Sequence, residues 1–243
     1  MEEELYRKFY EVENAHWWFV ARQKIIMDVI EHRIKLPAGS KVLDFGCGTG
    51  GVLSALSARF ESYGTDMSPL AIEFCRKRGI SRAYCCTLDK FPVPGVKFGL
   101  ITMLDVIEHI DDDEGILRQA LGFIEPGGYL IVTVPAYKFL WSSHDDLNHH
   151  KRRYTKRMLA DVLNRSGFST LRLSYYNTIL FPTALVERMA SKVAKSKGDG
   201  TLNIPPKPLN TVLARVFESE RFLLRRMTFP FGLSLLAVAR RPV

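Results

Sequence analysis

The chain has 243 residues, of which 47% are hydrophobic and 25% are charged, and its formal net charge at pH 7 is +8. These values are typical of a folded globular protein and exclude a fibrous or an intrinsically disordered chain. Its four cysteines, at 47, 75, 85 and 86, contain no Cys-x-x-Cys pair, which argues against a zinc site and a disulfide framework.

The N-terminal region, residues 1–36, is expected to form a helical cap. Apolar residues recur at helical spacing on both sides of the aromatic run His16-Trp17-Trp18-Phe19, which predicts two short helices. The chain opens with acidic residues instead of the basic and apolar segments of a signal peptide. No uncharged stretch is longer than the 14 residues of 173–186, which is too short to span a bilayer, so we expect a cytoplasmic protein.

Residues 37–176 are expected to form an α/β core in which strands and helices alternate. Strands are predicted at 41–45, 83–86, 98–104, 129–135 and 170–175, and a further strand is predicted to end at Asp66. Helices are predicted at 51–59, 111–124 and 155–165, and a further helix is predicted to begin at Pro69. The almost wholly apolar strand 98–104 is typical of a central parallel strand covered on both faces. Residues 136–154 are expected to form a loop rich in His and Asp.

The alternation of strands and helices is interrupted at 177–231, which we expect to be a helical insertion. Two apolar and basic helical segments, near 179–194 and 209–226, flank a linker rich in Gly, Pro and Lys. A last strand at 233–239 lies in the closing region, 232–243. All these parts are assigned to one domain covering 1–243.

The most informative segment is the glycine turn that follows strand 41–45. Gly46, Gly48 and Gly51 satisfy G-x-G-x-x-G, and Asp66 follows twenty residues after Gly46, a pattern that also suits a nicotinamide dinucleotide. Asp44 separates the two cofactors, because a carboxylate there repels a pyrophosphate but attracts an ammonium group. S-adenosylmethionine carries an ammonium group and no phosphate, so the turn favours that cofactor.

Each part of the turn has a predicted role in holding this cofactor. Gly46, Gly48 and Gly50 let the backbone approach its methionyl and ribose parts. The N-terminus of the next helix offers N–H groups to its carboxylate. Asp66, at the tip of the second strand, is placed to accept hydrogen bonds from both ribose hydroxyls.

The sequence resembles the class I S-adenosylmethionine-dependent methyltransferases of type 11/12. The family's D-x-G-x-G-x-G motif stands as residues 44–50, followed by L-D-V-I-E-H-I at 104–110 and a P-G-G turn at 126–128. The resemblance implies a three-layer, Rossmann-like, mostly parallel sheet of seven strands, with the last strand antiparallel between the fifth and the sixth. It also implies cofactor contacts from Met67, Thr87, Leu88 and Leu104. Thr87 stands where the family often has an adenine-binding Asp, unless the register shifts and Asp89 serves.

The N-terminal aromatic residues are further candidates for the cofactor site. Trp18 and its neighbours either fold over the cofactor as a lid that excludes water or pack helices together. Arg22 either neutralises the cofactor's carboxylate or caps a helix.

Three histidines are candidate general bases for removing a proton from the methyl acceptor: His109, after strand 98–104, and His144 and His149, in the loop 136–154. The alternatives are an orienting role for His109 and a solvated polar loop. We assign no metal ligand. A magnesium-assisted O-methyltransferase remains an alternative, because Asp105, Glu108 and His109 resemble the acid-x-x-Glu-His arrangement of such enzymes.

The predicted function is methyl transfer from S-adenosylmethionine to oxygen or nitrogen of a small, partly apolar or lipid-linked acceptor. The insertion 177–231 is interpreted as a pocket roof, a dimer face or a peripheral membrane contact, and the protein as a monomer or homodimer. Nucleic acid is not an expected partner, since the basic residues form no recognised motif. The rivals are a nicotinamide-dependent oxidoreductase and a noncatalytic cofactor-binding module.

Overall fold

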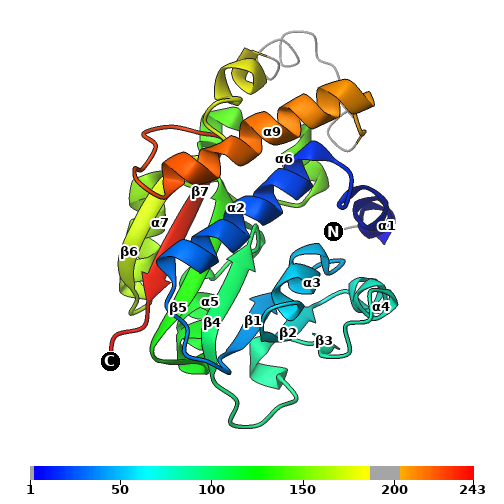
Figure 1. The fold of residues 1–243 in the computed structure, drawn as a ribbon. Helices are drawn as coiled ribbons and strands as arrows, with labels where there is room; N and C mark the ends of the chain where they lie inside the picture. The colour runs from blue at the N-terminus through cyan, green and yellow to red at the C-terminus, as the bar shows by residue number, and fades with distance from the viewer. Residues whose placement is uncertain (1–2, 187–202) are drawn as a thin grey trace.

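The computed structural model describes residues 3–186 and 203–243. Its seven strands form one sheet in the order β3-β2-β1-β4-β5-β7-β6 (Figure 1). The strands are β1 Lys41–Phe45, β2 Glu61–Asp66, β3 Ala83–Cys85, β4 Phe98–Leu104, β5 Ile124–Pro135, β6 Ser169–Tyr176 and β7 Ser234–Arg240. Only β7 is antiparallel to its neighbours, β5 and β6. The predicted fold, with its last strand reversed between the fifth and sixth, is therefore confirmed.

Helices cover both faces of this sheet. They are α1 Glu3–Val12, α2 Trp17–Arg33, α3 Gly51–Ser57, α4 Pro69–Lys77, α5 Asp113–Phe123, α6 Ser143–Leu147, α7 Lys156–Arg165 and α9 Lys207–Leu224, with the 3₁₀ turns η1 Leu88–Lys90, η2 Ile107–His109 and η3 Lys138–Leu140. Helices α2 and α9 cross the face toward the viewer in Figure 1, and α5 and α7 lie behind the sheet. The carboxyl ends of the parallel strands meet at one edge, where ligands of such sheets bind.

Several element boundaries follow from local sequence signals. The side chain of Ser68 caps α4 by accepting a hydrogen bond from Ala71 N, and Pro69 occupies the first turn. Thr155 caps α7 in the same way through Met158 N. Every residue of β4 is buried, as its apolar sequence predicted.

Helix α9 belongs to the predicted insertion and packs against α2. The ring of Trp17 meets that of Phe217 edge to face, with centroids 6.0 Å apart. Lys24 Nζ lies 2.6 Å from Glu218 Oε2. The buried carboxylate of Glu220 accepts hydrogen bonds from the two backbone N–H groups of residues 178 and 179, at 2.6 and 2.8 Å. The insertion is thus anchored both to the N-terminal region and to the chain leaving β6.

The structure corrects three details of the predicted elements. Helix α2 has 17 residues and is not short. The predicted loop 136–154 contains η3 and α6, and α6 begins where Asp145 accepts a hydrogen bond from Ser142 N. The helix predicted at 179–194 is seen at 181–186, and its remainder lies outside the described residues. Within the described residues, no helix is long and apolar enough to cross a membrane.

Candidate functional site

The glycine turn after β1 adopts a backbone conformation that favours glycine. The φ angles of Gly46, Gly48 and Gly50 are 73°, 54° and 86°. A Cβ atom on Gly46 would lie 2.5 Å from Val106, and one on Gly50 would lie 2.9 Å from the Cys75 sulfur. A Cβ on Gly48 would meet nothing within 4 Å. The first and last glycines are therefore required by packing, whereas Gly48 borders open space that suits a ligand.

Asp44 lies at the end of β1, beside this turn, and is 2% exposed. Its Oδ1 accepts a hydrogen bond of 2.6 Å from Thr102 Oγ1 on the neighbouring strand β4. Burial raises the pKa of Asp44 to about 6, and Thr102 and Arg22 oppose that rise. A buried carboxylate of this kind is stabilised by an added cation, which fits the ammonium group expected here.

Asp66, at the end of β2, holds the glycine turn in place. Its Oδ2 accepts a hydrogen bond of 2.9 Å from Gly48 N, and its Oδ1 accepts one of 2.9 Å from Ser68 N. The Tyr6 hydroxyl of α1 donates to the same Oδ1 at 3.1 Å. Burial and the nearby Asp66 raise the pKa of Tyr6, so this phenol remains a donor. Each carboxylate oxygen has two acceptor sites, so Oδ1 is filled by Ser68 N and Tyr6, whereas Oδ2 keeps one site for a ribose hydroxyl.

The turn that follows α1 reaches the start of α3 through Glu13, a contact that the sequence did not predict. Glu13 accepts a hydrogen bond of 2.5 Å from Thr49 Oγ1 and forms an ion pair with Arg78. Its carboxylate lies against Gly51, the first residue of α3, where we had expected the cofactor's carboxylate. That position is filled by the protein's own acid. The contact joins residues 36 to 65 positions apart, so no local pattern reveals it.

The predicted adenine contacts lie at the ends of β2, β4 and the segment after β3. Leu88 is fully buried and Leu104 is 9% exposed, while Met67 is 66% exposed beside Asp66. Thr87 Oγ1 is buried without a hydrogen bond of good geometry to any described residue, although Thr87 lowers the pKa of the exposed Asp89. The Thr87 hydroxyl therefore has capacity for a ligand hydrogen bond.

Arg22 lies in the middle of α2, so it is not a helix cap. Its guanidinium is buried, contacts Asp105 Oδ2 at 2.5 Å and donates to Thr133 Oγ1 at 3.2 Å. It lies 5.1 Å from the centre of the Trp18 ring, within range of a cation–π contact. The structure thus pairs Arg22 with a carboxylate of the protein, next to the end of β4.

The loop after β5 is organised around Asp145, whose side chain is fully buried. Arg153 binds it with two hydrogen bonds, of 2.7 and 2.9 Å, and His150 Nδ1 lies 2.8 Å from its Oδ1. Burial alone would raise the pKa of Asp145, but the hydrogen bonds from His150 and Arg153 hold it well below its usual range. The histidine that is paired with a carboxylate is therefore His150, which we had not singled out as a base.

The three predicted bases occupy different positions. His109, in η2, packs edge to face on His150, with ring centroids 4.7 Å apart. Burial, followed by the proximity of His150, lowers the pKa of His109 to about 4, so its imidazole is neutral at pH 7. His149 is exposed and has a left-handed backbone, φ 55°. The side chain of His144 lies outside what the structure describes.

Glu108, His109 and His150 form a cluster whose ligand atoms all lie within 4.8 Å of one another. Glu108 is fully buried, and neither of its carboxylate oxygens has a hydrogen-bond partner among the described residues. Burial and Asp105 raise its pKa well above the usual range. Asp105, which we had grouped with Glu108 and His109, is instead paired with Arg22. An orphaned buried acid next to two imidazoles fits a divalent cation.

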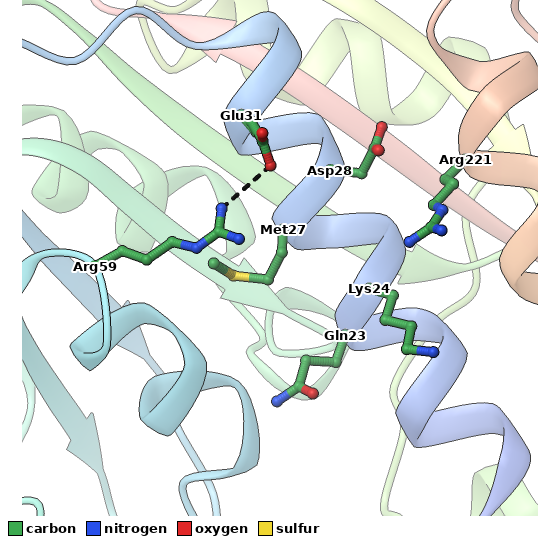
Figure 2. Close-up of a pocket in the computed structure, with 7 residues that line it drawn as sticks. All are labelled: Gln23, Lys24, Met27, Asp28, Glu31, Arg59 and Arg221. Carbon is green, nitrogen blue, oxygen red and sulfur yellow. Dashed lines mark hydrogen bonds and ion pairs between the residues drawn. The ribbon is translucent and has the colours of Figure 1, made fainter.

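A hollow of about 240 Å³ lies between α2, the segment that follows α3, and α9 (Figure 2). Its charged side chains have protein partners: Arg59 Nη1 lies 3.2 Å from Glu31 Oε2, and Lys24 pairs with Glu218. It contains none of the predicted site residues. The residues predicted for the cofactor and the acceptor lie instead around the carboxyl ends of β1, β2 and β4.

This fold and this site define a class I methyltransferase. Residues 19–173 match the methyltransferase-domain family Methyltransf_23, so the chain belongs to this family of S-adenosylmethionine-dependent methyltransferases.

Three particular proteins show how close the likeness is. A ubiquinone biosynthesis O-methyltransferase of Xanthomonas oryzae pv. oryzae is 28% identical over 141 residues, 52% of this chain and 58% of that protein. The tRNA (carboxymethyluridine(34)-5-O)-methyltransferase ALKBH8 of Macaca fascicularis is 26% identical over 64% of this chain and 23% of its own. The chain thus spans 58% and 23% of the two relatives' lengths. A crystal structure of a SAM-dependent methyltransferase from Archaeoglobus fulgidus aligns with a TM-score of 0.59 at 18% identity, covering 96% of this chain and 98% of that one.

Proposed function

We propose that this protein transfers a methyl group from S-adenosylmethionine to a small, partly apolar or lipid-linked acceptor, at oxygen or nitrogen. The observation that carries the proposal is the pair of acids beside the glycine turn. Among the described residues, no basic side chain forms an ion pair with the buried Asp44, and Asp66, beside the same turn, keeps one acceptor site. Family membership favours this function over a nicotinamide-dependent oxidoreductase or a noncatalytic module.

Every part of the cofactor except its carboxylate, whose expected position Glu13 fills, has a proposed group to hold it. Asp44 binds the ammonium group, and Asp66 accepts a hydrogen bond from one ribose hydroxyl. Gly48 lets the backbone lie against the ligand, because a side chain there would enter the open space. Leu88, Leu104, Met67 and Thr87 surround the adenine, and Trp18 closes the methionyl end with Arg22 beneath it. When bound, the sulfonium supplies an activated methyl group that needs alignment more than activation.

For an acceptor that carries a proton, we propose that the imidazoles after β4 and β5 remove it. His150 is oriented by Asp145, which is itself fixed by Arg153, so the ring has a defined position and a defined hydrogen-bond partner. The neutral His109 packs on this ring. His144 and His149 remain candidates on the same loop.

A metal-assisted reaction is the second candidate, favoured by the unpartnered buried Glu108. Together with His109 and His150 it offers one carboxylate and two imidazoles. This donor set suits Mn²⁺ or Zn²⁺ better than Mg²⁺, which prefers oxygen ligands. A cation held here would bind and acidify an acceptor hydroxyl.

The two candidates are separated by one experiment on the purified protein. Labelled S-adenosylmethionine is incubated with pools of apolar phenols, amines and lipid extracts, with and without EDTA, and labelled products are identified by mass. A labelled product formed equally in EDTA supports the imidazole base, and one that is lost in EDTA and restored by Mn²⁺ supports the metal. Tight cofactor binding without any labelled product would count against methyl transfer to this acceptor class.

A further inference from the structure

A group of apolar side chains gathers where β5 and β6 end and where the chain returns to β7. We call Tyr137, Phe139, Ile179, Phe181 and Phe231 the aromatic corner. The Tyr137 ring stacks on Phe139, with centroids 5.1 Å apart, and meets Phe181 at 6.3 Å. Phe181 in turn lies 5.4 Å from Phe231. Three segments that are far apart in the sequence thus build one surface at the carboxyl edge of the sheet.

Much of this surface is open to solvent. The exposed fractions are 58% for Phe139, 44% for Ile179 and 42% for Phe231, while Tyr137 and Phe181 are partly buried beneath them. Exposed apolar patches of this kind usually mark an interaction site. The ten residues 177–186 contain no charged side chain, so nothing in this stretch opposes contact with an apolar phase.

Positive charge accompanies the apolar surface. At the corner itself, the exposed Lys138 precedes Phe139 and forms no ion pair with any described residue. An apolar centre with an exposed lysine at its edge is complementary to anionic lipid headgroups over a hydrocarbon layer.

The aromatic corner also adjoins the proposed acceptor site. Arg153, which holds Asp145 and through it His150, donates a hydrogen bond of 2.9 Å to Ala136 O, one residue before Tyr137. A surface at this place lies beside the groups that would receive an apolar acceptor.

We propose that the aromatic corner docks on an anionic phospholipid bilayer, with Phe139, Ile179 and Phe231 inserted at the headgroup level and Lys138 against the lipid phosphates. This docking rests on the proposed function in that it would bring a lipid-linked acceptor to the site, but binding to the bilayer does not itself require methyl transfer. Vesicle binding and methyl transfer can therefore fail independently.

The test is co-sedimentation of the full chain with vesicles of phosphatidylcholine alone or with one third phosphatidylglycerol. Binding is expected to the anionic vesicles and to weaken at high salt. Ile179→Asp and Phe231→Asp should each weaken it about tenfold, and Lys138→Glu about fivefold. The matched controls are Leu171→Asp, near the start of β6 and 53% exposed, and Lys35→Glu, an exposed lysine before β1; both should bind as the unaltered chain does.

Circular dichroism and thermal melting of each variant verify that it is folded. Absence of binding to either vesicle, or equal binding to both, would overturn the proposal. It would also be overturned if the control substitutions weakened binding as much as those at the corner. A dimer in solution that the corner substitutions dissociate, without any binding to vesicles, would instead identify this surface as a contact between two copies of the chain.

Discussion

We predict that Asp44 makes cofactor affinity depend on pH, with a magnitude that follows from the environment of its carboxylate. In the free protein, burial raises its pKa from the ordinary 3.8 to about 6. In the proposed site the cofactor's ammonium group binds only the ionised form of Asp44, so cofactor affinity should fall about tenfold for each pH unit below about 6. Cofactor affinity should level off near pH 7 and fall again at about pH 8, where the α-amino group of the cofactor loses its proton. A proton should be taken up by the buffer when the cofactor binds near pH 6.

The same carboxylate affects stability with a defined sign. Because the folded protein binds the proton more tightly than the unfolded chain, ionisation of Asp44 opposes folding, and stability is lost as pH rises from about 4 to about 6. The difference in pKa corresponds to about 3 kcal/mol. Asp44→Asn keeps a partner for Thr102 but removes the charge. Without cofactor, this variant should melt at a higher temperature at pH 7, and its cofactor affinity should fall 10- to 100-fold, on the order of 1.5–3 kcal/mol.

Titration calorimetry with S-adenosylhomocysteine between pH 5 and 8 measures the affinities and, in buffers of different ionisation enthalpy, the released proton. Asp161→Asn, on the exposed side of α7, makes the same charge change away from the site and should leave the pH profile unchanged. A profile that is flat between pH 5 and 7 in the unaltered chain, or one that Asp44→Asn does not flatten, would refute the assignment of the ammonium group to Asp44.

Three further predictions concern the rest of the site. Gly48→Ala and Gly39→Ala both place a side chain at positive φ with nothing within 4 Å, so each should lower the free energy of unfolding by about 1 kcal/mol. Only Gly48→Ala should abolish cofactor binding. Equal cofactor affinities of the two variants would contradict the placement of the cofactor against Gly48. Asp145→Asn leaves Arg153 buried without a carboxylate and should lower the free energy of unfolding by about 3–5 kcal/mol. An Asp145→Asn variant as stable as the unaltered chain would refute the buried ion pair. His150→Asn, in contrast, should remove turnover but leave cofactor affinity unchanged. Glu108→Gln replaces a buried acid whose raised pKa favours the protonated form, so the melting temperature of this variant in EDTA should match that of the unaltered chain. The rise in melting temperature produced by Mn²⁺ should disappear in the variant, and a rise that survives would place the cation elsewhere.

The sheet was predictable because its signals are local. The apolar run of β4, the glycine turn after β1 and the cap at Ser68 each determine an element from a few adjacent residues. The place of β7 between β5 and β6 came from the family resemblance, and the pairing of Val132 with Ala237 confirms it.

The polar contacts of the site were less predictable, since they join distant parts of the chain. Tyr6 reaches Asp66, and Arg22 reaches Asp105, across 60 and 83 positions of sequence. In the histidine loop, the choice among neighbouring histidines depended on the geometry of α6, whose first turn places Asp145 against His150. Composition showed that the loop was rich in acids and bases, but not which pair would form.

The central claim is that the turn at residues 44–50 binds S-adenosylmethionine. It is tested most directly by calorimetric titration of the purified chain at pH 7 with S-adenosylhomocysteine, and separately with NAD. The predicted result is one site per chain for S-adenosylhomocysteine, weakened at least tenfold by Asp66→Asn, and no heat from NAD. Binding of NAD, or S-adenosylhomocysteine affinity that Asp66→Asn leaves unchanged, would contradict the claim.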